Sequence, residues 1–144
     1  LKVVKNAWEN IARDHLTLGG APWGGIGLHH EIYNLKGFWS PYGWVETCNT
    51  MSWIHLSREL FKITGEAQYA EMIEQAIFNS LLGAQYPDGE NWCYFTFPNG
   101  CRHLSIYRDC CRSSGMVALE EIPPLIFSAS AASWACSISA RKER

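Results

Sequence analysis

The chain has 144 residues, of which 18% are charged, and its formal net charge at pH 7 is −2. This length suits one domain, but the charged fraction lies below the roughly 25% typical of soluble domains. Because the chain also begins at Leu1 in what reads as a helix, we expect an interior piece of a larger protein. No run approaches the roughly 18 uncharged apolar residues of a membrane span, and the charge gives no basic surface. We therefore expect neither a membrane nor a nucleic acid as partner.

The spacing of apolar residues near the start of the chain predicts a helix over residues 1–16. Its buried stripe is expected to consist of Val3, Val4, Ala7, Trp8 and Ile11, at helical steps of three and four residues.

A long loop is predicted from Gly19 to Trp44, because repeated glycines and a proline disfavour helices and strands. It carries one carboxylate, Glu31, two histidines and four aromatic rings; the rings are Phe38, Trp39, Tyr42 and Trp44. Loops of this length inside a domain are usually functional. Two interpretations stay open: the rings stack on a flat ligand such as a sugar ring, or they close the end of a helical core.

Two helices are predicted next, over residues 47–64 and 66–84, with Gly65 as the C-terminal cap of the first. The first has apolar residues at helical spacing, namely Trp53, Leu56, Leu60 and Ile63. The second has a longer stripe, namely Tyr69, Met72, Ile73, Ala76, Ile77 and Ser80. The short joint predicts an antiparallel helical hairpin.

The rest of the chain predicts smaller elements. Aromatic residues over 92–97, between two turn sequences, indicate a short strand. A short helix is predicted over 112–122 and is expected to end at Pro123 and Pro124. Residues 128–144 show no period, and we expect an irregular tail there.

Six cysteines stand at positions 48, 93, 101, 110, 111 and 136. They would form a disulfide framework in a small secreted protein, but a helical chain of this length favours free or metal-bound thiols. The cellular compartment stays open. A pairing of Cys93 with Cys101 is possible, although buried free thiols are more common.

Cys110 and Cys111 are adjacent, and neighbouring cysteines rarely reach disulfide geometry. They can share a metal ion instead. With Glu46 and Cys48 they would supply three thiolates and one carboxylate, a donor set that suits tetrahedral Zn²⁺. For convergence, Glu46 and Cys48 should lie on an extended segment before the helix, and the cysteine pair at a turn or helix start.

Such a cluster with Zn²⁺ carries a charge of about −2 and needs compensation. Arg108 and Arg112 flank the cysteine pair and either compensate this charge or remain solvated. Zinc held by four protein ligands is usually structural. A catalytic site would require one thiolate as nucleophile and a protonatable carboxyl group nearby, for which Glu31 is the candidate in the loop.

Several motifs together resemble glycoside hydrolase family 127, whose founding activity is β-L-arabinofuranosidase. They are Gly24-Gly25-Ile26-Gly27, Glu31, Val45-Glu46-Thr47-Cys48, Ile63-Thr64-Gly65, Tyr69-Ala70, Ala76-Ile77-Phe78-Asn79 and Cys110-Cys111. The resemblance covers roughly residues 1–127. It implies a mainly α chain with a short β segment, a partial (α/α)₆-barrel catalytic domain over 1–127 and an irregular tail over 128–144.

The resemblance also implies roles for individual residues. Zn²⁺ would be bound by Glu46, Cys48, Cys110 and Cys111. Cys110 would be the nucleophile of a retaining mechanism and Glu31 its acid/base, acting on β-L-arabinofuranosides or related furanosides. We expect the isolated chain to be inactive, because most of the barrel would be missing. The alternatives are a non-catalytic helical domain with a structural zinc site, and thiols that act in redox chemistry without metal.

Overall fold

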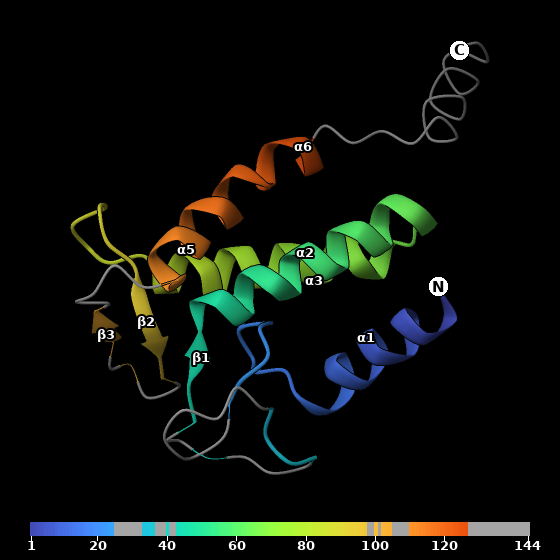
Figure 1. Ribbon diagram of the computed structural model, residues 1–144, viewed down its shortest axis with the longest axis horizontal. Helices are drawn as coiled ribbons and strands as arrows, with labels where there is room; N and C mark the ends of the chain where they lie inside the picture. Colours follow the sequence, from blue (N-terminus) through green and yellow to red (C-terminus); the bar gives the residue numbers. More distant parts are fainter. Residues whose placement is uncertain are drawn as a thin grey trace, which may run out of the picture.

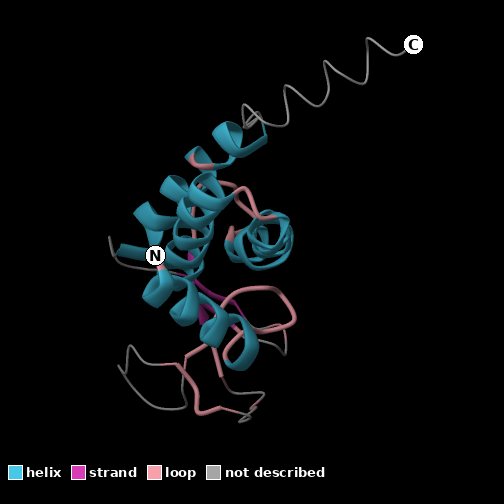
Figure 2. Ribbon diagram, turned by 90° about the vertical axis from the view of Figure 1, so that its right-hand side faces the viewer, coloured by secondary structure: helices cyan, strands magenta, loops and turns pink. Residues whose placement is uncertain are grey.

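The computed structural model describes residues 1–24, 33–36, 40, 43–97, 100, 102–104 and 110–126. Its elements in chain order are α1 (Lys2–Asp14), β1 (Val45–Glu46), α2 (Thr47–Thr64), α3 (Ala67–Gln75), the π-helical η1 (Ala76–Leu81), α4 (Leu82–Ala84), β2 (Cys93–Thr96), β3 (Arg102–Leu104), α5 (Cys110–Glu120) and α6 (Ile122–Ile126). The described chain is mainly helical, as predicted, and its strands are short and grouped together (Figures 1 and 2). None of these helices combines the length and apolarity needed to cross a membrane. The tail predicted over 128–144 lies outside the described residues.

The predicted helical hairpin is confirmed: α2 and α3 pack against each other (Figure 1). Gly65 joins them in the left-handed conformation, with φ 69° and ψ 10°, and its N–H donates to the carbonyl of Phe61 at 2.7 Å. A residue without Cβ adopts this conformation at little cost, which explains the position of the cap. Of the four apolar residues at helical spacing in α2, Trp53 and Leu60 are buried, whereas Ile63 is 64% exposed.

The helix predicted over 66–84 is continuous but not uniform, because η1 interrupts the α-helical geometry between α3 and α4. Short π-helical segments are often found at functional sites. Here the segment carries Ser80, whose hydroxyl donates to the carbonyl of Gly19 at 2.8 Å. This bond fixes the start of the long loop to the hairpin.

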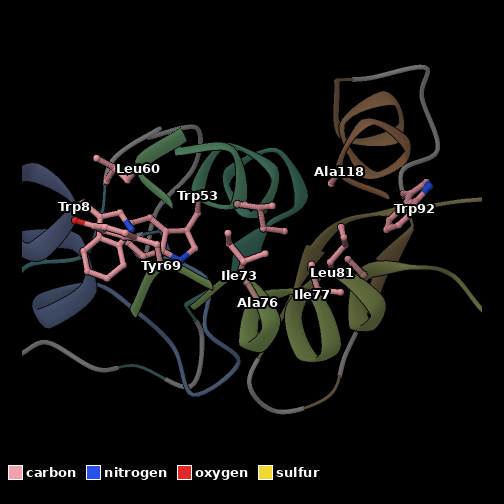
Figure 3. Packing of buried hydrophobic residues seen from close by; sticks show 12 residues of the cluster. Trp8, Trp53, Leu60, Tyr69, Ile73, Ala76, Ile77, Leu81, Trp92 and Ala118 are labelled. Carbon is pink, nitrogen blue, oxygen red and sulfur yellow. The ribbon is translucent and has the colours of Figure 1, made fainter. Parts of the chain in front are cut away.

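Trp8 is the buried residue of helix α1, and Ile11 and Ala12 pack against the same core. Trp8 stacks on Trp53 with ring centroids 5.3 Å apart and meets Tyr69 edge-on at 4.7 Å (Figure 3). Its indole N–H donates to Ser57 at 2.8 Å. The rest of the predicted stripe is not buried as expected. Ile11 is partly buried, but three further members are exposed, namely Val3, Val4 and Ala7. Periodicity identified an apolar face, but no described element covers its first two turns.

A three-stranded antiparallel sheet stands at the start of α2, in the order β1-β2-β3. Its β2 confirms the predicted strand, whereas β1 and β3 were not predicted. Glu46 pairs with Phe95, and a register shift between Cys93 and Phe95 marks a bulge in β2. Strand β1 runs directly into α2 (Figure 1), so the sheet fixes where that helix begins.

Helix α5 begins two residues before the predicted start and packs on α2. The prediction that Pro123 and Pro124 end this helix is wrong: α5 ends at Glu120, and both prolines lie in the first turn of α6. In a first turn the backbone N–H has no helical partner, so proline is tolerated there.

Candidate functional site

Four side chains from two distant parts of the sequence meet at the junction of β1, α2 and α5. They are Glu46, Cys48, Cys110 and Cys111, hereafter the thiol–carboxylate cluster. Each offers one ligand atom, and these atoms all lie within 4.8 Å of one another. The structure therefore brings together all four residues that the sequence proposed as metal ligands.

The first half of the cluster comes from the point where strand becomes helix. Glu46 has extended backbone, with φ −88° and ψ 137°, as predicted, but Cys48 is the second residue of α2 and not a residue before it. At the start of the helix, the Thr47 hydroxyl donates to the carbonyl of Cys93 at 2.7 Å, and the Thr50 hydroxyl donates to that of Glu46 at 3.2 Å. The side chains converge across this turn from strand to helix, without a fully extended segment.

The second half of the cluster is the first turn of α5, as predicted for adjacent cysteines. Cys110 is exposed, whereas Cys111 is completely buried. Both thiols reach the cluster from this turn, and they differ in their exposure to solvent.

The contacts within the cluster centre on Cys48. Its Sγ lies 3.2 Å from the Sγ of Cys111 and 3.3 Å from the Oγ of Ser114, and the Cys111 thiol donates to Glu46 Oε1 at 3.6 Å. Hydrogen bonding, first from Cys111 and then from Ser114, lowers the pKa of Cys48 to about 6 despite its partial burial. Cys48 is thus the sulfur that ionises first.

The other two thiols behave in the opposite way. The hydrogen bond to Cys48 raises the pKa of Cys110 and of Cys111, and burial raises both further. Without a cation, ionisation of Cys48 therefore disfavours ionisation of Cys110 and Cys111. A bound divalent metal favours deprotonated sulfur, so ionisation of one thiol would then no longer prevent ionisation of the others.

The donor set fits Zn²⁺. Thiolate sulfur and carboxylate oxygen are both zinc ligands, and four of them match tetrahedral coordination. The cluster is partly buried. Burial of its charged groups costs free energy unless they are paired or bound to a metal ion.

Two residues at the site were not found from the sequence. Ser114 follows Cys110 by four residues, which places both on one face of a helix, so its spacing was an available signal. Tyr94 had no such signal. Burial raises its pKa to about 12, and the charges of Glu46 and of the cluster thiols add to this effect. Its closeness to the cluster depends on the sheet.

Other candidates are only partly described. Glu31, Arg108 and the histidines of the loop lie outside the described residues, as do three of its four rings. The fourth ring, Trp44, packs against Phe95 of β2 with ring centroids 5.0 Å apart.

Two further residues singled out in the sequence, Arg112 and Cys93, are described. Arg112 is exposed, and its charge adds to hydrogen bonds from Asn91 and Glu90 in lowering the pKa of Asp88. Cys93 is buried and free.

The architecture is that of known glycosidases. A solved GH127 β-arabinofuranosidase superposes with a TM-score of 0.63 at 22% identity, covering 79% of this chain and 18% of that one. A second structure, described as a glycoside hydrolase, gives a TM-score of 0.54 at 18% identity, covering 77% of this chain and 24% of that one. The chain thus spans less than a quarter of the length of either.

A search of curated proteins finds no match. The family comparison is decisive, because residues 1–123 match the family model described as "Beta-L-arabinofuranosidase, GH127 catalytic domain". This match includes every residue of the thiol–carboxylate cluster, and it agrees with the helical architecture described above. The chain belongs to glycoside hydrolase family GH127.

Proposed function

We propose that this chain carries the metal and nucleophile part of the active site of a retaining glycoside hydrolase that acts on β-L-arabinofuranosides or related furanosides. The observation that carries the proposal is the unequal burial of the two adjacent thiols: Cys111 is enclosed, and Cys110 is accessible. One sulfur can serve only as a ligand, while the other can reach a sugar.

In this proposal the thiol–carboxylate cluster holds Zn²⁺, which as a Lewis acid keeps its sulfur ligands deprotonated. The chain's own residues perform the substitution. Cys110 Sγ attacks the anomeric carbon, forming a C–S bond as the glycosidic C–O bond breaks, and the leaving oxygen takes a proton from Glu31. Water then displaces the sulfur, giving its proton to Glu31, and two inversions leave the configuration retained.

Glu31 receives the acid/base role because it is the single carboxylate of the predicted loop between Gly19 and Trp44. General acid catalysis of this kind contributes about 10²- to 10⁴-fold to the rate. The proposal concerns the full-length protein of which we expect this chain to be a part, since the match covers only 18% and 24% of the solved relatives.

A structural zinc site is the second candidate. It is favoured by the number of protein ligands, because four leave no open position for water. The two candidates assign different roles to Cys110 and Glu31. A structural site needs Cys110 only as a ligand and does not need Glu31, whereas a catalytic site needs Cys110 as nucleophile and Glu31 as acid/base.

The test measures hydrolysis of an aryl β-L-arabinofuranoside by the full-length protein, together with zinc content per chain. Cys110→Ala is expected to abolish turnover, and Glu31→Gln to lower it by about 10²- to 10⁴-fold with zinc retained. Cys93→Ala is the matched control, since it removes a buried thiol outside the cluster and should stay active. Activity of Cys110→Ala would overturn the mechanism, and unchanged activity of Glu31→Gln would favour the structural site.

A further inference from the structure

Ser114 lies on the inner side of α5 and is only 8% exposed. Its Oγ is 3.3 Å from the Sγ of Cys48 on α2. Helices α2 and α5 pack closely along this seam. A buried hydroxyl without a partner costs free energy, and the sulfur of Cys48 is the partner that satisfies it.

The two adjacent serines of α5 have different partners. A serine within a helix commonly bonds back to a carbonyl one turn earlier, which for Ser114 is that of Cys110. In α5 that carbonyl already accepts a hydrogen bond from Ser113 at 2.9 Å. Ser113 thus bonds locally, whereas the hydroxyl of Ser114 lies next to Cys48 of the neighbouring helix.

We propose that Ser114 is a positioning residue of the metal centre, whose hydroxyl donates to the Cys48 thiolate and fixes that sulfur as a permanent ligand. The inference rests on the proposed function, because it assumes that the cluster binds Zn²⁺. Hydrogen bonds from an outer residue to a metal ligand orient it and tune its donor strength.

With the hydrogen bond from Ser114 to Cys48, the three sulfurs of the cluster have different roles. Cys111 is held by burial and Cys48 by Ser114, while Cys110 is exposed at the helix start. When Cys110 bonds to a sugar, two sulfurs and the carboxylate of Glu46 remain to retain the ion. Without Ser114, Cys48 would be free to change its side-chain conformation, and the ion would be held less firmly.

The test compares the full-length wild-type protein with Ser114→Ala, Ser114→Thr and Ser113→Ala. Zinc affinity is measured by competition with a chromophoric chelator, and the site is examined with Co²⁺ through its thiolate-to-metal charge-transfer band. Ser114→Ala is expected to bind zinc about 10-fold more weakly. Its band should move to longer wavelength, because loss of the hydrogen bond raises the energy of the sulfur lone pairs. Ser113→Ala is the matched control and should resemble wild type.

Ser114→Thr keeps the hydroxyl and should return the band towards its wild-type position. Equal affinity and identical bands in Ser114→Ala and wild type would overturn the role of Ser114 while leaving the zinc site intact. Equal shifts in the Ala and Thr variants would also overturn it, since packing would then be the cause. Absence of zinc binding by the wild type would overturn both this inference and the proposed function.

Discussion

At the scale of single residues, chemically identical thiols acquire different properties from their places on two helices. Cys48 ionises most readily because neighbouring groups donate to it, and Cys111 is protected by complete burial. Cys110, one position away, is exposed because a helix rotates successive side chains by about 100°. Position in the first turn of α5 therefore decides which thiol is accessible to a substrate.

Substitution of Gly65 tests whether the left-handed backbone conformation alone determines where α2 ends. An added Cβ would meet nothing within 4 Å, but φ is +69°, so Gly65→Ala is strained only through its backbone. We expect Gly65→Ala to lower the free energy of unfolding by about 1 kcal/mol. Urea denaturation measures this effect.

Gly83→Ala is the matched control for Gly65→Ala. Gly83 also has open space around it but lies within helix α4. Alanine favours helical backbone over glycine, so the control should gain about 0.5–1 kcal/mol. Changes of the same sign in both variants would contradict the assignment of the cap.

At the scale of elements, the position of α5 depends on a close contact between Gly115 and Trp92. A Cβ at Gly115 would lie 2.1 Å from Cδ2 of the tryptophan ring, which is itself only 3% exposed. Glycine is therefore required here for space, not for an unusual φ. The same helix carries two members of the thiol–carboxylate cluster.

Gly115→Ala should therefore push α5 away from Trp92. Overpacking of this kind costs about 1–3 kcal/mol, and the shift should also weaken zinc binding, because Cys110 and Cys111 move with the helix. Denaturation and chelator competition measure the two effects, with Gly83→Ala as the control for a glycine replaced in open space. Wild-type stability and affinity in Gly115→Ala would show that α5 is not held by this contact.

The elements also show what the sequence could predict. The hairpin of α2 and α3 followed from local periodicity and a glycine cap, both of which act over a few residues. The cluster was predicted from the chemistry of its residues. Adjacent cysteines rarely form a disulfide with each other, and together with a Glu-x-Cys pair they supply a set of zinc ligands. Strands β1 and β3 were not predicted, because each has at most three residues and their pairing depends on β2.

Errors in the predictions have related physical causes. The apolar face of α1 was identified correctly, but burial requires a neighbour, and only Trp8 among its predicted members is fully covered. Cys48 was placed outside the helix because spacing was judged from an ideal strand or helix, whereas the real chain changes from one to the other at Thr47. Tyr94 depends on the register of a bulged strand, which local sequence does not specify.

At the scale of the whole molecule, the described residues present apolar surface that a complete domain would be expected to cover. Phe78 is 66% exposed and borders a groove of about 320 Å³ between the hairpin and α6. The solved relatives are several times longer than this chain. We therefore expect the stability of these elements to depend on the rest of the barrel.

Metal binding should contribute to that stability by joining distant segments. Cys48 and Cys111 are 63 residues apart in sequence, and Zn²⁺ bound between them would tie the start of α2 to the start of α5. A ligand that binds only the folded state stabilises it by about 2.7 kcal/mol at 100 times its Kd. Removing zinc with a chelator should therefore lower the Tm of the full-length protein.

The response to the chelator should disappear in one variant and persist in another. Cys111→Ala removes a buried member of the cluster, so its Tm should be low with or without chelator. Cys93→Ala also deletes a buried thiol but leaves the cluster complete, so its Tm should still fall when zinc is removed. Comparison of the two separates loss of the metal from loss of packing. A wild-type Tm that does not change with chelator would mean that the four side chains meet without binding an ion that matters to the fold.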